Sequence, residues 1–240
     1  MSLTVTTANS TPSPAAQAVT PQTVRDQAAA TGNPQSDSAL AVTVPVITID
    51  QTGTNWNLFG LPPNQEFAFN TGTIRITLRQ EVFIANDLSS CARGVWAVHE
   101  NLHVRDNAAI LTRMPAEIAA DPSLQAIFRD KQRFPRGDFA LIQQAAENMI
   151  GDIFRRLTGN AARGHDTRRE YSRVNQEIIR TCPGPHFHTV ERGENLSLLS
   201  EFYYGTQRHY MKLYDHNRAV IGSNPNLIRP GQKLEIPRIP

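Results

Sequence analysis

The stretch "AVHENLHVRDN", residues 97 to 107, contains His99, Glu100 and His103 in the order H-E-x-x-H. Apolar residues around it recur at helical spacing, which predicts a helix over this part of the chain. Side chains four residues apart lie on one face of a helix, so the two imidazoles can reach one metal ion. This helix is therefore the central element of the predicted fold.

The residue types in this stretch favour a zinc site with its own general base. Neutral imidazole suits zinc, and two such ligands leave room for a third protein ligand and a water molecule. Glu100 is placed to take a proton from that water, because zinc lowers the pKa of the water towards neutrality. The same carboxyl group can return the proton to a leaving amine. The pattern predicts hydrolysis of an amide bond with zinc as cofactor.

The third zinc ligand is open at this stage. A histidine ten residues after the first would fall at Ala109, so that arrangement is excluded. The segment "GHDTRREYSRV" places His165 at a loop-to-helix junction, and we take His165 as the first candidate. Three acidic residues are the alternatives: Asp166, Glu170 and Glu147.

Two aspartates and a tyrosine are predicted to support the zinc site. Asp106 follows the motif by one helical turn, and Asp166 is adjacent to His165, so both are predicted to hold a ligand histidine. Tyr171 is predicted to donate to a developing oxyanion. A purely local interpretation competes with this, because Thr167 to Glu170 has the form of a capping box that only begins a helix.

Composition and charge limit the classes of function. The chain has 240 residues, of which 40% are hydrophobic and 19% charged, as in globular proteins. A formal charge of +2 gives no reason to expect nucleic acid as a partner. No apolar run reaches the roughly 18 residues of a membrane span, so none is predicted.

The N-terminal sequence and the two cysteines bear on the cellular location of the protein. The first residues have neither a basic region nor an apolar core, so no Sec signal peptide is predicted. The protein is expected either to stay in the cytoplasm or to leave by another route. Cys91 and Cys182 can pair if the protein is exported, whereas two free thiols fit a reducing compartment.

The chain divides into three regions. Residues 1 to 42 are rich in Ser, Thr, Pro and Ala and are predicted to be a disordered tail. Residues 43 to 182 begin with the strand-like runs "AVTVPVITID", "EFAFN", "GTIRITL" and "EVFIAN" and continue with four helices, which predicts an α+β domain with a small antiparallel sheet. Residues 183 to 240 read β-α-α-β, with His186 and His188 on the first strand, most simply on its exposed face.

The segments "EVFIANDLSSCARGVWAVHENLHVRDN" and "DTRREYSRVNQEIIRTC" resemble a group of bacterial zincin-type metallopeptidases. The resemblance covers residues 45 to 182. In that group a cysteine shortly precedes HExxH, and a D-T-x-x-E-Y segment precedes a second cysteine. The resemblance implies a zincin fold and favours pairing of Cys91 with Cys182, but it implies no particular substrate.

The segment "FHTVERGENLSLLSEFYYGTQRHYMKLYDHNRAVIGSNPNLIRPGQKLEIP" resembles a LysM domain along its whole length. The turn "GENL" stands where such domains usually have G-D-T-L. The resemblance implies binding of peptidoglycan or a related N-acetylglucosamine glycan through two loops. The implied contact residues are Gly193, Glu194, Asn195, Leu196, Asn224, Pro225, Asn226, Leu227 and Ile228.

Two functions from different classes follow from these features. The first is a zinc-dependent peptidase or amidase that the LysM domain directs to cell-wall glycan, in the bacterial cell envelope or secreted by a non-Sec route. The second is a component, adaptor or toxin cargo of a phage tail or contractile injection system, in which the LysM domain serves docking to other proteins.

Overall fold

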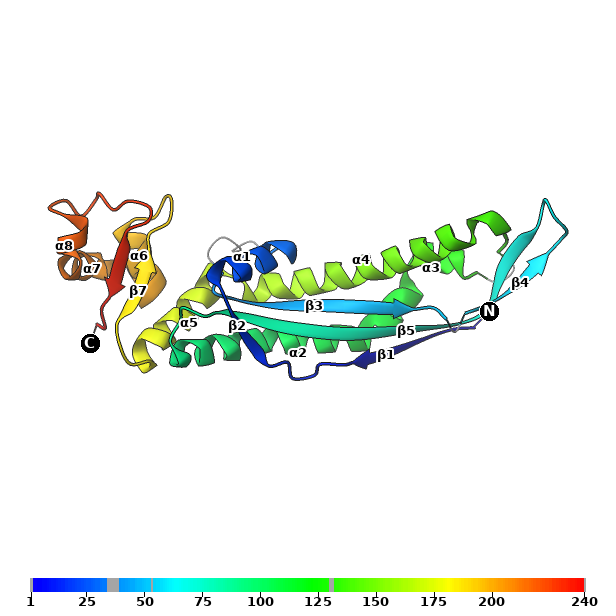
Figure 1. Ribbon diagram of the computed structural model, residues 1–240, viewed down its shortest axis with the longest axis horizontal. Coiled ribbons are helices and arrows are strands. Elements are labelled where there is room, and N and C mark those ends of the chain that lie inside the picture. Colours follow the sequence, from blue (N-terminus) through cyan, green and yellow to red (C-terminus); the bar gives the residue numbers. More distant parts are fainter. Residues whose placement is uncertain (1, 34–38, 53, 130–131, 240) are drawn as a thin grey trace.

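The computed structural model describes residues 2–33, 39–52, 54–129 and 132–239. The molecule is elongated, with a sheet and two long helices running side by side and a small C-terminal unit at one end (Figure 1). The mixture of helices and strands confirms the predicted α+β class in its broad form.

The sheet is built around one long strand. Its six strands are β1 (Ser2–Asn9), β2 (Ala16–Val19), β3 (Ala41–Asp50), β4 (Asn55–Phe59), β5 (Glu66–Ala85) and β6 (Phe134–Pro135). All the others pair with β5: β1 and β2 run parallel to it, and β3, β4 and β6 run antiparallel. The predicted purely antiparallel sheet is therefore wrong, because two N-terminal strands join it in the parallel direction.

β5 also replaces three separately predicted strands. Its pairing register with β4 shifts between Asn55 and Trp56. Across this irregularity the buried positions of β5 change from Phe67 and Phe69 to Ile74 and the alternate residues after it. A bulge of this kind lets one strand continue while its inward face changes parity, so the glycine and asparagine near residue 72 do not end it.

Helices cover the sheet. They are α2 (Ser90–Ala120), α3 (Pro122–Ile127), a 3₁₀ turn η2 (Arg136–Asp138), α4 (Phe139–His165) and α5 (Arg168–Thr181). Asp121 caps α3 and Pro122 is its first residue. α4 continues past Gly159 to His165. None of the helices in the described ranges is long and apolar enough to cross a membrane.

The N-terminal region is part of this domain. Besides β1 and β2 it forms helix α1 (Pro21–Ala30), whose Val24 and Ala28 are fully buried. The expectation of a disordered tail over residues 1 to 42 is therefore wrong for residues 2–33 and 39–42, whereas residues 1 and 34–38 lie outside the described residues. These segments are ordered because β1 and β2 pair with β5, and because α1 packs on the surface of the domain.

The C-terminal unit has the predicted β-α-α-β order. It contains β7 (His186–Thr189), α6 (Leu196–Tyr204), a 3₁₀ turn η3 (Gln207–His209), α7 (Tyr210–His216), α8 (Arg218–Ile221) and β8 (Lys233–Ile236). The unit packs against α5: Ser172 Oγ donates to the carbonyl of Phe202 at 2.8 Å, and Ile179 belongs to the unit's hydrophobic core. The two parts of the chain are thus joined by side-chain contacts as well as by the chain itself.

Candidate metal centre

Helix α2 places the motif inside the protein. Ser89 caps the helix by accepting a hydrogen bond from the amide of Ala92. His99, Glu100 and His103 are 1%, 2% and 8% exposed. On a surface helix these polar side chains would face water. Because they are buried instead, they need partners inside the protein.

These three side chains could hold a metal ion. One ligand atom from each lies within 4.8 Å of the others. Both ring nitrogens of His99 are buried and have no hydrogen-bond partner among the described residues. Buried polar atoms are nearly always satisfied, so a histidine in this state fits a missing ligand such as a metal.

Asp166, from a distant part of the chain, lies beside this group. It follows the last residue of α4, where its amide donates to the carbonyl of Ala162 at 2.7 Å. Its Oδ1 lies 3.2 Å from Nε2 of His103 and 3.9 Å from Nε2 of His99. Burial raises the pKa of Asp166, but the two histidines outweigh this effect and the pKa is lowered. Asp166 is therefore a carboxylate that faces both imidazoles.

Glu100 has its own partner on the sheet. Thr43 Oγ1 donates to Oε2 of Glu100 at 2.7 Å and lies 3.2 Å from its backbone carbonyl. Burial raises the pKa of Glu100, although the nearby histidines and Thr43 act in the opposite direction. A carboxyl group with a raised pKa, held in one orientation, is suited to exchange a proton. The sequence gives no signal for Thr43, because 57 residues separate it from Glu100.

Neither Asp166 nor His165, the first candidate for the third ligand, belongs to the three-residue group among the described residues. Nε2 of His165 lies 2.8 Å from Oδ2 of Asp106, and the two side chains are 31% and 40% exposed. The ring of His165 lies against the ring of His103, with 5.4 Å between centroids. The predicted partnership of Asp106 with a histidine is present, but that histidine is His165 and not a member of the motif.

Tyr171 also has a different place from the one predicted. Its hydroxyl donates to Oδ1 of Asp166 at 3.2 Å and accepts from Nδ2 of Asn33 at 3.2 Å. Its ring packs against Trp96 and His99. Because the hydroxyl proton is used on Asp166, Tyr171 orients that carboxylate and is not available as an oxyanion donor.

The two glutamate alternatives lie apart from the imidazole Nε2 atoms. Glu170 pairs with Arg173 at 2.6 Å and its Oε1 is 3.9 Å from Nδ1 of His99. Glu147 accepts from Nε2 of Gln51 at 3.1 Å. The capping interpretation is confirmed in part: Thr167 accepts from the amide of Glu170, but the amide of Thr167 donates to the carbonyl of His165 and the side chain of Glu170 binds Arg173.

A cavity of about 240 Å³ opens beside the metal-binding group. It lies between the end of α1, strand β3 and helices α2 and α4. Glu100, His103 and Asp166 face it, and so do Thr43 and the α4 residues Arg155, Thr158, Gly159, Ala162 and Arg163. The candidate metal-binding atoms are therefore next to a space that a small part of a larger molecule can enter.

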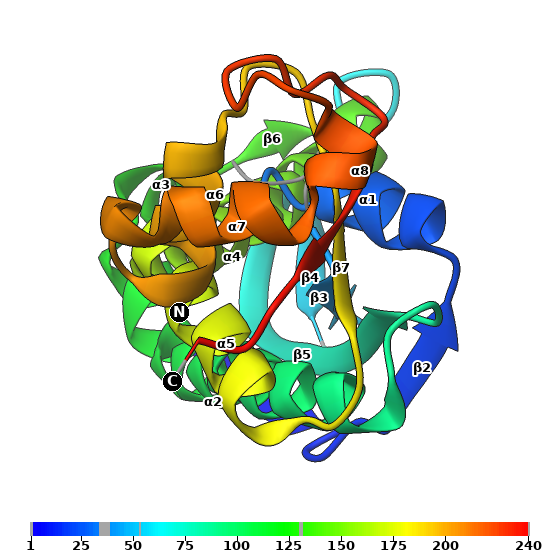
Figure 2. The ribbon, with the colours of Figure 1, turned by 90° about the vertical axis from the view of Figure 1, so that its left-hand side faces the viewer.

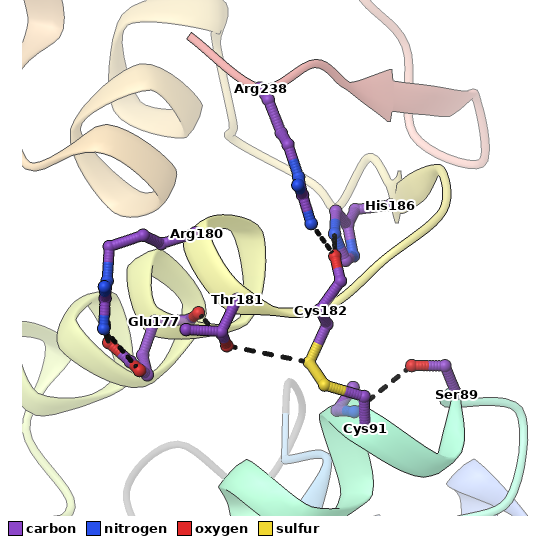
Figure 3. The surroundings of a disulfide bond; sticks show 9 residues. Ser89, Cys91, Glu177, Arg180, Thr181, Cys182, His186 and Arg238 are labelled. Carbon is purple, nitrogen blue, oxygen red and sulfur yellow. Dashed lines mark hydrogen bonds and ion pairs between the residues drawn. A yellow bond between two sulfur atoms is a disulfide. The ribbon is translucent and has the colours of Figure 1, made fainter. Parts of the chain in front are cut away.

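A disulfide links the helices on either side of this centre. Cys91, in the first turn of α2, is bonded to Cys182, the residue after α5 (Figure 3). This confirms the pairing implied by the sequence resemblance. The carbonyl of Cys182 also accepts from Arg238 and from His186, as Figure 3 shows. The disulfide thus joins α2 to the end of α5, and the carbonyl of Cys182 also contacts the first residue of β7 and the segment after β8.

The residues predicted to bind glycan lie in two loops of the C-terminal unit. The turn after β7 and the loop before β8 lie side by side (Figure 2). Two backbone hydrogen bonds of 2.8 Å hold them together, between Val190 and Gln232 and between Gly231 and Val190. The two loops that contain the predicted segments are thus joined at their bases, and Leu227 in the second loop is 56% exposed.

Two of the predicted glycan contacts have structural roles instead. Leu196 is buried in the core of the unit, so it cannot touch a ligand. Glu194 accepts from Nε2 of His188 at 2.6 Å and from the amide of Glu191 at 2.7 Å. The glutamate that distinguishes this turn therefore fastens it to β7.

Comparisons with known proteins find similarity over short segments. An uncharacterized protein of Deinococcus radiodurans is 48% identical over 54 residues, which is 22% of this chain and 20% of that protein. The potassium binding protein Kbp of Escherichia coli is 41% identical over 51 residues, 21% of this chain and 34% of Kbp. The chain thus spans about a fifth and a third of these relatives. No family model and no solved structure matches it.

Proposed function

We propose that the protein is a zinc-dependent peptidase or amidase whose C-terminal unit binds cell-wall glycan. The observation that carries the proposal is the buried group of His99, His103 and Asp166, with the unpartnered nitrogens of His99 at its centre. Two imidazoles and a carboxylate are a donor set that suits zinc and leaves a position open. We infer that Asp166, rather than His165, is the third ligand.

Each remaining residue of the centre has a task in amide hydrolysis. Zinc, when bound, would supply Lewis acid chemistry by polarising a carbonyl group. Glu100 would take a proton from the attacking water and deliver it to the leaving amine. Thr43 would fix the carboxyl group of Glu100, and Tyr171 would fix that of Asp166, through the hydrogen bonds described above. The cavity would admit the chain that carries the scissile amide.

Metal analysis of purified variants tests the ligand assignment. The wild type should contain about one zinc per chain after loading, and His103→Ala and Asp166→Ala should lose it. Tyr171→Phe removes only a partner of Asp166, so its zinc affinity should fall by about 10- to 100-fold, as for outer residues of metal sites. Asp106→Ala is the control and should retain zinc. A zinc content unchanged in Asp166→Ala would exclude Asp166 as a ligand.

Binding to purified peptidoglycan sacculi tests the glycan part of the proposal. Leu227→Asp places a charge on an exposed apolar position in the loop before β8. Losing the burial of one leucine against a ligand is worth about 1.5 to 3 kcal/mol, so binding should weaken by roughly 10- to 100-fold. Met211→Asp, on α7, is the matched control. Sacculi bound equally by both variants would argue that the C-terminal unit docks to a protein instead.

A further inference from the structure

We propose that Arg163 forms a cationic subsite in the cavity beside the metal group and selects substrates that carry a carboxylate close to the scissile amide. The inference rests on the proposed function and narrows its substrate class. It depends on three features of α4: the position of Arg163 relative to Asp166, the glycine beneath its side chain, and the partners of its charge.

The spacing along α4 places Arg163 close to the reacting position. Arg155, Gly159 and Arg163 are successive i, i+4 neighbours, so they form one row of the helix, and all three line the cavity. The side chain of Arg163 leans towards the N-terminus of α4, over Gly159 and Asn160, as long side chains on helices do. A group bound by Arg163 therefore lies in the same cavity as the carboxylate that faces the histidines.

Gly159 leaves room for the guanidinium group. Nη1 of Arg163 lies 3.9 Å from the position that a Cβ on Gly159 would occupy. A Cβ at that distance would make an ordinary van der Waals contact with the guanidinium group. The side chain of Arg163 therefore lies over Gly159, along the row of α4 that lines the cavity.

The charge of Arg163 is not matched by its partner. Its guanidinium donates to Oδ1 of Asn160, which is neutral. Arg155, by contrast, forms an ion pair with Asp152 and lies about two helical turns before Arg163 in the same row. In the cavity, the carboxylate of Asp166 is paired with His103, and that of Glu100 with Thr43. Arg163 is therefore the group best placed to receive an additional anion.

A carboxylate is the anion that fits this position in a peptidase or amidase. Guanidinium groups bind carboxylates through two parallel hydrogen bonds, which fixes orientation as well as charge. The carboxylate can belong to an aspartate or glutamate side chain or to the C-terminus of a peptide. Both sources share the same chemistry, so the experiment has to separate them.

The activity test uses zinc-loaded protein and mixed peptides in two forms, one with amidated and one with free C-termini, with the products identified by mass spectrometry. For the amidated set, cleavage next to Asp or Glu should exceed cleavage next to Asn or Gln by about tenfold. If the terminal carboxylate is the ligand, only the free set should show cuts, near its C-terminus. For Arg163→Ala, the ratio of cleavage between preferred and other peptides should be close to one. Arg163→Glu should reverse the preference, so that cleavage next to Lys and Arg is favoured.

Arg156→Ala is the matched control for these variants. Arg156 is on the same helix but pairs with Glu117, outside the residues that line the cavity. It should keep the wild-type preference. Equal cleavage of charged and neutral peptides by the wild type, or an equal loss of preference in Arg156→Ala and Arg163→Ala, would overturn the subsite.

A binding test separates failure of the subsite from failure of the proposed function. Cobalt-loaded protein is titrated with acetohydroxamate and with the monohydroxamate of succinate, and the visible spectrum of the cobalt is followed. The carboxylate-bearing probe should bind about tenfold more tightly to the wild type and equally to Arg163→Ala. This result without peptide cleavage would support the subsite and argue against the peptidase. Equal binding of both probes to the wild type would overturn the subsite even if peptides are cleaved.

Discussion

Replacing Glu100 by Gln should abolish most of the hydrolysis and leave the zinc in place. Glutamine keeps the shape of the side chain but cannot accept a proton, so the contribution of general base catalysis is lost. That contribution is typically 10²- to 10⁴-fold, and we expect kcat to fall by about this factor. Zinc-loaded wild type and variant are compared on purified sacculi and on fluorescently labelled casein.

The same variant distinguishes a base from a ligand. Glu100 belongs to the group of side chains that could hold a metal, so its removal could also release the ion. If Glu100→Gln retains about one zinc per chain and is inactive, it acts as the base. If it loses the zinc, Glu100 is a ligand and Asp166 has another role. A fully active variant would contradict the proposed mechanism. Glu147→Gln, which removes a carboxyl group bound to Gln51, is the control.

Removing the disulfide should have the largest effect on stability. Cys91 and Cys182 are 91 residues apart, and closing a loop of this length in the unfolded chain is worth about 4.6 kcal/mol by the chain-entropy relation. The variant Cys91→Ser with Cys182→Ser should therefore unfold at a temperature lower by roughly 10 to 18 °C. Thermal unfolding followed by circular dichroism measures this difference.

The position of the disulfide links stability to the metal centre. Cys91 precedes His99 by eight residues on α2, and α5 begins two residues after Asp166. Reduction of the wild type should therefore lower both the unfolding temperature and the zinc affinity, whereas the reductant should leave the double serine variant unchanged. An unfolding temperature that does not respond to reduction would show that the fold holds these helices together without the bond.

The sequence determined the elements that depend on local patterns. HExxH lies on a helix because apolar residues flank it at helical spacing and Ser89 supplies a cap. Asp121 with Pro122 begins α3, and Thr167 begins α5, through hydrogen bonds that form within a few residues. The order of elements in the C-terminal unit is local for the same reason. These features could be predicted because their causes are close together in the chain.

The N-terminal strands show where local patterns fail. The run Ser2–Asn9 alternates Leu3 and Val5 with polar residues, but its composition is that of a disordered segment. It becomes a strand because β5, more than 60 residues away, offers a parallel edge, and because Leu3 and Val5 pack on the main core. Such a segment gains its stability only from the partner, which its own residues do not reveal.

For the candidate metal centre, part of the arrangement follows from the sequence and part only from the tertiary structure. The residues of HExxH indicated two candidate ligands and a candidate base, since helix geometry fixes their mutual placement. The sequence could not place His165 and Asp166 relative to this group, because the two are adjacent and either chemistry suits a metal. The tertiary structure shows their places: α4 continues to His165, whose ring lies against Asp106, and Asp166 faces both imidazoles. One additional residue of helix changes the direction of a side chain by about 100°, and only the packed structure fixes where the helix ends.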